Sequence, residues 1–231
     1  MHQPCDAAGQ LSPKTCIREM PLILELFSGT GSMGKAFKEL GWEVVSLDCN
    51  PKAEATITCD ILDWEPPPGL KPDHVHASPP CTEYSIAKTT GLRDLELADR
   101  IARKTLDIIA DLRPRTFTIE NPWTGMMKGR EFMRDLNHQM QKVTYCRYGL
   151  QYKKTTAIWT NLLEWTPRPL CTKAHPCSNV VNGRHAFTAQ RGPCRKSSGD
   201  TRDVFSRDEL YRIPAELCRE LAWAATKAQA P

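Results

Sequence analysis

The sequence lacks any long hydrophobic run. Its most apolar N-terminal stretch is residues 21–27, which is far shorter than the roughly 20 apolar residues that a membrane helix needs. The same stretch has neither the basic leader nor the cleavage site of a secretory signal. We therefore expect an intracellular protein that spans no membrane, in the cytoplasm and nucleoid or in the nucleus depending on its source.

The chain as a whole also has little net charge. The net charge is only +4 in 231 residues, so the protein is not a polycation. The positive charge is concentrated, however, because residues 166–203 contain seven Lys or Arg against two Asp. Such a basic segment suits a polyanionic partner, although a solvated loop would have the same composition.

Internal repeats are absent, and the cysteines follow no overall pairing pattern. Most of the 10 cysteines stand singly, which in a reducing compartment is typical of buried packing residues. The exception is a late cluster of Cys171, Cys177 and Cys194. The length allows one sizeable core and little more. We expect one main domain with a small appendage.

What the sequence does contain is an alternation of strand-like and helix-like segments. The expected strands are residues 23–27, 43–47, 56–60, 74–77, 116–120, 143–148 and 157–160, and the expected helices are residues 32–40, 95–112, 131–141 and 214–227. Alternation with short connections predicts an α/β fold with a doubly wound, mostly parallel sheet.

Four segments follow from this pattern. We expect a loose tail at residues 1–19, a cofactor-binding and catalytic domain at 20–164, a short irregular insert at 165–204, and a helical segment at 205–231 that packs back on the catalytic domain.

A glycine-rich loop follows the first expected strand. Ser28, Gly29 and Gly31 let backbone amides approach a ligand beside a helix N-terminus. Asp48, nineteen residues after Gly29, ends the next strand and can accept both hydroxyls of a ribose. Asp60 and Ile61 end the third strand and can serve an adenine. Strand ends share one crevice in such sheets, which suits nicotinamide dinucleotides and S-adenosylmethionine alike.

Two reactive side chains stand at or just after the ends of later strands. Cys81 stands in a rigid proline turn, after Pro79 and Pro80, and Glu120 ends the strand of residues 116–120. A thiol and a carboxyl group presented together can attack and protonate one electron-poor ring.

Three motifs now stand in order, and together they resemble those of the C5-cytosine DNA methyltransferase family. They are the Glu25–Gly31 loop, Pro79-Pro80-Cys81 with Ser85, and Glu120-Asn121-Pro122, and the resemblance covers roughly residues 20–162. It implies a Rossmann-like, S-adenosylmethionine-dependent fold in which Cys81 adds to cytosine C6. Glu120 then hydrogen-bonds the ring, with Asn121 holding the loop around it and the base flipped out of the duplex.

The resemblance also implies a set of cofactor contacts. Phe27 packs against the adenine, the loop of Ser28, Gly29 and Gly31 surrounds the ligand, and Asp48 holds the ribose. Asp60 holds the adenine amine beside Ile61, and Pro80 lines the cleft and belongs with the catalytic loop.

The chain departs from the family pattern at two places. Glu25 stands where an aspartate is usual, and Lys153 with Lys154 replaces the arginines of a later Gln-x-Arg-x-Arg motif. Lysine keeps the charge and loses the planar fork of arginine. The expected nucleic-acid contacts are Ser85, Lys153, Lys154, Lys173, Arg184 and Arg191.

The insert holds a set of potential metal ligands. We expect Cys171, His175, Cys177 and Cys194, with His185 as the alternative histidine, to bind one structural zinc ion. Unpaired cysteines and surface histidines are the other interpretation.

The leading hypothesis is a monomeric DNA (cytosine-5-)-methyltransferase that uses S-adenosylmethionine and acts on DNA. One alternative is the tRNA-acting branch of the same family, with RNA as the partner. Another is a non-catalytic nucleic-acid-binding regulator. A nicotinamide-dependent oxidoreductase would leave the Pro-Pro-Cys and Glu-Asn motifs without a task.

Overall fold

One seven-stranded sheet forms the centre of the protein. The computed structural model describes residues 20–185, 187–189 and 205–229, and the expected N-terminal tail lies outside them. The strand order is β3-β2-β1-β4-β5-β8-β6. The strands are β1 (Leu22–Leu26), β2 (Glu43–Asp48), β3 (Ile57–Thr58), β4 (His74–Ala77), β5 (Thr116–Pro122), β6 (Met140–Thr144) and β8 (Thr155–Thr160).

The sheet is mostly parallel, as the sequence predicts. Strands β1 to β5 all pair in parallel, and β8 pairs antiparallel with both β5 and β6. The chain starts in the middle, at β1, builds outward through β2 and β3, and returns to place β4 on the other side of β1. The carboxyl ends of the first five strands therefore meet at one edge, where ligands bind in open α/β sheets.

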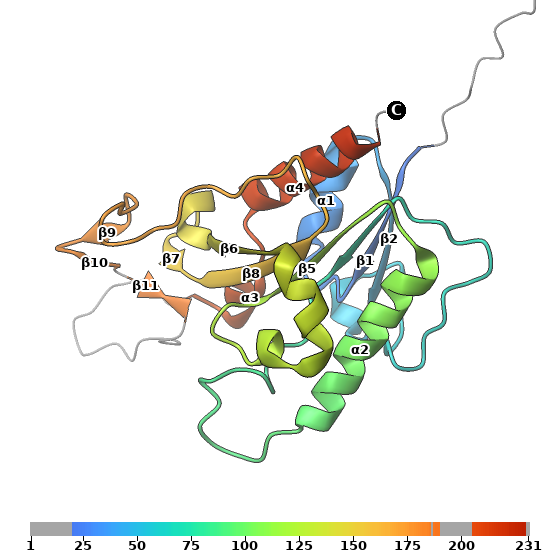
Figure 1. Ribbon diagram of the computed structural model, residues 1–231, viewed down its shortest axis with the longest axis horizontal. Helices are drawn as coiled ribbons and strands as arrows, with labels where there is room; N and C mark the ends of the chain where they lie inside the picture. Colours follow the sequence, from blue (N-terminus) through green and yellow to red (C-terminus); the bar gives the residue numbers. More distant parts are fainter. Residues whose placement is uncertain (1–19, 186, 190–204, 230–231) are drawn as a thin grey trace, which may run out of the picture.

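Helices cover both faces of the sheet (Figure 1). Helices α1 (Ser32–Glu39) and α4 (Ala215–Ala228) pack together on one face, and α2 (Leu95–Leu112) covers the other. Helix α2 has the predicted bounds, because the Asp94 side chain caps its N-terminus by accepting from the Leu97 amide, 2.8 Å away. The remaining helical segments are α3 (Arg207–Tyr211) and the 3-10 turns η1 (Pro51–Ala53), η2 (Met127–Gly129), η3 (Glu131–Gln139) and η4 (Tyr145–Tyr148).

Three expected elements differ from the structure. The strand expected at 56–60 is reduced to Ile57–Thr58 in β3. Residues 131–139 form the 3-10 segment η3 rather than an α-helix, and strand β6 begins at Met140. As a result, the expected strand at 143–148 begins three residues earlier and gives way to the turn η4 from Tyr145 onward. Apolar side chains at these positions are buried in either geometry, so periodicity alone does not separate the two.

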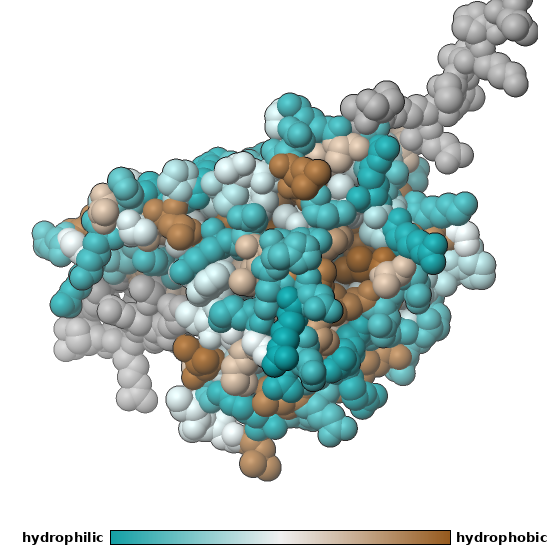
Figure 2. All heavy atoms as spheres, in the orientation of Figure 1, coloured by the Kyte–Doolittle hydropathy of each residue, from teal (hydrophilic) through white to brown (hydrophobic). Residues whose placement is uncertain are grey.

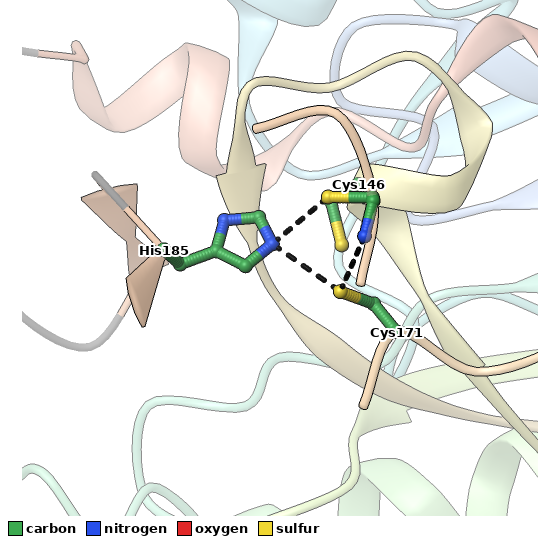
Figure 3. Close-up of side chains that lie close together, drawn as sticks. Cys146, Cys171 and His185 are labelled. Carbon is green, nitrogen blue, oxygen red and sulfur yellow. Dashed lines mark hydrogen bonds between the residues drawn. The ribbon is translucent and has the colours of Figure 1, made fainter. Parts of the chain in front are cut away.

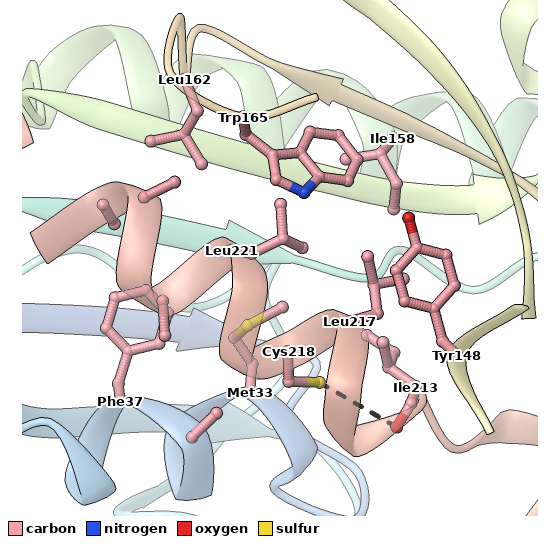
Figure 4. Close-up of a cluster of buried hydrophobic side chains, with 14 of the residues drawn as sticks. Met33, Phe37, Tyr148, Ile158, Leu162, Trp165, Ile213, Leu217, Cys218 and Leu221 are labelled. Carbon is pink, nitrogen blue, oxygen red and sulfur yellow. Dashed lines mark hydrogen bonds between the residues drawn. The ribbon is translucent and has the colours of Figure 1, made fainter. Parts of the chain in front are cut away.

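Each face of the sheet has its own hydrophobic core. Ile23 joins the core under α1 and α4, shown in Figure 4, whereas Leu24 joins the core under α2. The same alternation, which follows from the two-residue period of a strand, places the polar side chains. Glu25 points toward α1, where it binds helix amides, and Glu120 meets a tyrosine of the same core.

The segment after β8 forms few regular elements. Two small sheets pair β9 (Val180–Val181) with β10 (Arg184–His185), and β11 (Phe187–Thr188) with β7 (Tyr152–Lys153). Figure 1 shows β9 and β10 projecting beyond the main sheet. The face seen in Figure 2 is largely hydrophilic, with hydrophobic side chains in small separate patches. Among the described residues, no helix has both the length and the apolar character needed to cross a bilayer.

Candidate active site

A cavity of about 660 Å³ lies at the carboxyl ends of the strands. Residues from the loops after β1, β2 and β4 and from the carboxyl end of β5 line it, together with parts of the C-terminal segment. The predicted site residues in its wall are Phe27, Ser28, Gly29, Asp48, Pro80, Cys81, Glu120 and Lys154. The cavity therefore joins most of the expected cofactor loop to both reactive side chains.

The glycine-rich loop turns tightly between β1 and α1. Phe27, Gly29 and Gly31 adopt φ values of 58°, 50° and 63°, a left-handed conformation that is costly for a phenylalanine and that concentrates at functional sites. The Gly31 amide donates to the Ser28 carbonyl over 2.7 Å. The Ser28 hydroxyl is buried and has no hydrogen-bond partner among the described residues, so the cavity wall has an unused polar group.

Asp48 is fixed beside this loop. One carboxylate oxygen accepts from the Gly29 amide and the other from the Asn50 amide, each over 2.8 Å. These bonds fix the position of the carboxylate in the cavity wall at the end of β2. A ribose with two adjacent hydroxyls is a chemical match for a carboxylate held in this way.

Glu25 is buried beneath the loop. Its carboxylate accepts from the amides of Met33 and Gly34, over 3.1 and 3.0 Å, at the start of α1. Burial is the main cause that raises the pKa of Glu25 to about 7, against the lowering effect of the two amides. A Cβ at Gly34 would lie 2.6 Å from a Glu25 oxygen, so the close approach of the carboxylate requires glycine there.

The loop that carries Cys81 is tied to the end of β5. The Asn121 side chain, which is fully buried, donates to the carbonyl of Pro79 over 2.9 Å. This bond joins the Pro79-Pro80-Cys81 turn to the residue after Glu120. The cysteine loop and the end of β5 are therefore held in one relative position, and both side chains face the same cavity.

Electrostatics also connects the two groups. Burial raises the pKa of the Cys81 thiol above its usual value, and the Glu120 carboxylate raises it further, whereas the Lys154 ammonium lowers it. The thiol is therefore mainly protonated at neutral pH in the free protein. Thiolate formation must depend on a ligand or on proton transfer within the site.

Glu120 has two partners that hold one of its oxygens. The Tyr145 hydroxyl donates to Oε1 over 2.7 Å, and Lys154 Nζ lies 3.6 Å from the same atom. No hydrogen bond from the described part of the chain reaches Oε2. The lysine side chain is only 12% exposed and pairs with the Glu120 carboxylate, and the expected contact of Lys154 with nucleic acid stays a prediction. Tyr145 gave no signal in the sequence beyond its hydrophobic pattern.

Several predicted site residues do not line the cavity. Asp60 is exposed and its side chain accepts from the Leu62 amide, whereas Ile61 packs in the core under α2. Gly31 caps helix α1. The Ser85 hydroxyl accepts from the Ala87 amide within its own loop. Their predicted contacts with cofactor or nucleic acid stay predictions.

Lys153 and the described basic residues of the insert do not line the cavity. Lys153 donates to the Cys171 carbonyl over 3.1 Å, and Lys173 and Arg184 are exposed. Arg191 lies outside the described residues.

Four side chains near the insert form a cluster that can hold a metal ion, which we call the Cys3His cluster. It consists of Cys146, Cys171, Cys177 and His185, whose ligand atoms all lie within 4.8 Å of one another. The expected His175 is exposed and is not a member, so His185, the alternative, takes that place. Cys194 lies outside the described residues. Cys146 was not expected as a ligand, because it precedes Cys171 by 25 positions and lies outside the insert.

Comparison with known proteins identifies the family. No protein-family model matches the chain. The chain is 33% identical over 222 residues to a probable DNA (cytosine-5)-methyltransferase of Frog virus 3, an alignment that covers 86% of this chain and 97% of the viral protein. The chain belongs to the C5-cytosine DNA methyltransferase family. The motif resemblance stated from the sequence is thus confirmed.

Two other similar proteins have lower sequence identity to the chain. The type II methyltransferase M.AplI of Arthrospira platensis is 24% identical over 141 residues, which is 56% of this chain and 39% of that protein. A crystal structure of a DNMT2 mutant from Spodoptera frugiperda superposes with a TM-score of 0.45 and 20% identity, covering 64% of this chain and 55% of the other.

Proposed function

We propose that this protein transfers a methyl group from S-adenosylmethionine to C5 of cytosine in DNA. The observation that carries the proposal is the common cavity of Cys81 and Glu120, with the two loops joined by the bond from Asn121 to Pro79. Family membership supports the same reaction, because the Frog virus 3 relative is named a probable DNA (cytosine-5)-methyltransferase.

The cavity wall fits S-adenosylmethionine. Asp48 presents a fixed carboxylate for the ribose hydroxyls, Phe27 offers an aromatic face, and the unpartnered Ser28 hydroxyl provides a further polar contact. Glu25 lies in the same wall, and its carboxyl group suits the cationic amine of a methionine. S-adenosylmethionine supplies an electrophilic methyl group on a sulfonium centre.

Cys81 acts as the nucleophile. Its thiolate forms a bond to C6 of a cytosine that has been flipped out of the duplex, and the C5–C6 π electrons become available at C5. C5 would then take the methyl group from the sulfonium of S-adenosylmethionine, which would leave as the neutral thioether S-adenosylhomocysteine. Loss of the C5 proton to water would return the C5–H electron pair to the C5–C6 double bond as the sulfur–C6 bond breaks, which restores the aromatic ring and the thiolate. Covalent addition thus replaces one prohibitive step by two easier ones.

Glu120 binds the ring during this addition. Tyr145 and Lys154 both contact Oε1, which leaves Oε2 for the N3 and exocyclic amine edge of cytosine. Because cytosine N3 is an acceptor, Glu120 must carry a proton on Oε2 when the base is bound and donate it to N3; this hydrogen bond strengthens as N3 gains negative charge, so it stabilises the transition state more than the ground state. Lys154 also partly offsets the effect of the Glu120 carboxylate on the Cys81 pKa, so it supports thiolate formation.

The test is a transfer assay with labelled S-adenosylmethionine and either duplex DNA or tRNA. We expect label at cytosine C5 of DNA, and loss of at least about 10³-fold in rate for Cys81→Ser, since removing a nucleophile is among the largest single effects in covalent catalysis. Cys49→Ser is the matched control, because Cys49 is exposed and does not line the cavity.

Three results would count against the proposal. Label on tRNA alone would assign the chain to an RNA substrate. Label on neither nucleic acid, with S-adenosylmethionine still bound in calorimetry, would indicate a non-catalytic regulator. Equal rates for Cys81→Ser and the unmodified protein would remove Cys81 from the reaction.

A further inference from the structure

The Cys3His cluster brings together residues that are distant in the sequence. Cys146 belongs to the turn η4 of the catalytic body, Cys171 and Cys177 belong to the start of the insert, and His185 lies on the short strand β10. Cys146 and Cys171 are buried, at 6% and 3% exposure. Three thiols and one imidazole on three separate segments do not meet through local chain geometry.

The distances within the cluster match a tetrahedral site. The Nε2 atom of His185 lies 3.1 Å from the Cys177 sulfur and 3.5 Å from the Cys171 sulfur. Zinc–sulfur bonds of about 2.3 Å and zinc–nitrogen bonds of about 2.0 Å place such ligands roughly 3.5 Å apart around one ion. Figure 3 shows the His185 ring directed toward the cysteine side chains from the other side of the cluster.

Other contacts support the positions of these ligands. The Cys177 amide points at the Cys171 sulfur over 3.4 Å, and the Cys171 amide donates to the Thr144 hydroxyl over 2.9 Å. Lys153 donates to the Cys171 carbonyl, which brings one positive charge beside a donor set that is rich in thiolates. Bonds of this kind outside the ligands orient them and stabilise a bound metal.

The insert also lacks the packing that would otherwise order it. Among its described residues after Trp165, Cys171 is the one buried hydrophobic side chain. Val181 on β9 is 62% exposed. Segments with so little apolar burial generally need a metal or disulfides for a fixed structure. Cys146, Cys171 and Cys177 form no disulfide in the structure, so a bound metal is the remaining way to order the segment.

We propose that Cys146, Cys171, Cys177 and His185 bind one structural Zn²⁺ ion, which joins the insert to the catalytic body. Three thiolates with one imidazole in a closed tetrahedral set are typical of structural zinc. The ion has a second consequence through Cys146. The neighbouring residue in the chain, Tyr145, holds Glu120 in the cavity, so the metal fixes the same turn that positions the carboxylate.

The proposal is tested on the full-length protein purified under reducing conditions. Elemental analysis should give about one zinc per chain. Exchange for Co²⁺ should produce the visible bands of a tetrahedral ion and a thiolate charge-transfer band in the near ultraviolet. Neither readout depends on methyl transfer, so the result is independent of the proposed function.

Two histidine variants form a matched pair. His185→Ala should weaken zinc binding by more than about a hundredfold in competition with a chelator, because loss of a partner outside the ligands already costs roughly 10- to 100-fold. His175→Ala should leave the affinity unchanged. The opposite result for the pair, or full zinc occupancy in His185→Ala, would overturn the ligand assignment.

The cysteines provide a second pair. Cys146→Ser should lose the charge-transfer intensity of one thiolate in the Co²⁺ form, a spectral change that remains measurable when the variant is less stable. Cys194→Ser should retain the spectrum of the unmodified protein. Loss of the metal in Cys194→Ser, or a disulfide among the cluster cysteines with no metal in the reduced protein, would refute the proposal.

Discussion

In the catalytic body, Cys81 follows strand β4 and Glu120 lies near the end of strand β5, and both strands are packed on both faces. In the insert, Cys171 of the Cys3His cluster is itself the main buried contact. The position of Cys81 relative to Glu120 depends on a sheet that would remain folded without either residue. The position of His185 relative to Cys171 has no such support. Packing of the sheet fixes the cavity residues of the body, whereas under our proposal the zinc ligands of the Cys3His cluster fix the insert.

The strongest test of this difference is removal of the metal. A zinc chelator under reducing conditions should raise amide hydrogen exchange in residues 171–185 by more than about a hundredfold, because zinc supplies much of the folding free energy of such segments. Exchange in β1 and β4 should remain slow. Equal acceleration in both regions would show that the insert and the body unfold as one unit.

The next test uses pH and concerns the body alone. The pKa of Glu25 is raised from 4.5 to about 7 in the folded protein, so the folded state holds a proton that the unfolded chain releases. The corresponding stabilisation is complete below about pH 4.5 and is lost as the pH rises to about 7, and it amounts to about 3 kcal/mol.

Urea unfolding across this pH window measures the effect. Glu25→Gln should flatten the dependence of the unfolding free energy on pH, and Glu43→Gln, at an exposed position of β2, is the matched control. An unchanged slope in Glu25→Gln would mean that another group carries the proton.

The smallest effect is expected at the turn where the two regions meet. Tyr145→Phe removes the hydrogen bond to Glu120 Oε1 and should lower kcat by roughly 10- to 100-fold, since a bond to a charged group contributes about 1.5–3 kcal/mol. The KM for S-adenosylmethionine and the zinc content should stay the same, because the hydroxyl touches neither site. The readouts are steady-state kinetics and elemental analysis.

Tyr152→Phe is the control for this variant. Tyr152 is equally buried, but its hydroxyl donates to the backbone carbonyl of Glu209. A comparable fall in kcat for both variants would indicate a general loss of packing rather than a positioning role for Tyr145.

Much of the catalytic body could be predicted from the sequence. Helix α2 has the expected bounds because its cap, its apolar period and the proline after it are all local features. The cofactor loop, Cys81 and Glu120 follow strands that were recognisable from short apolar runs, and the parallel sheet brings their ends to one edge. The family followed from the order of the motifs.

The remaining features needed the tertiary structure. The pairing of β8 with β5 and the turn η4 place the ammonium group of Lys154 against Glu120, while its expected contact with nucleic acid stays a prediction. Asp60 was expected to end a strand at residues 56–60, yet β3 contains only Ile57–Thr58 and the aspartate is not among the residues that line the cavity. Such outcomes depend on side-chain directions that sequence spacing leaves open.

The sequence by itself determined the fold class and the family and predicted the two reactive groups, because local periodicity and motif order are written along the chain. The tertiary structure alone decided the partners of those groups. Tyr145 reaches Glu120 and Cys146 reaches His185 across 25 and 39 positions, and contacts between distant segments arise from packing, which no local pattern records.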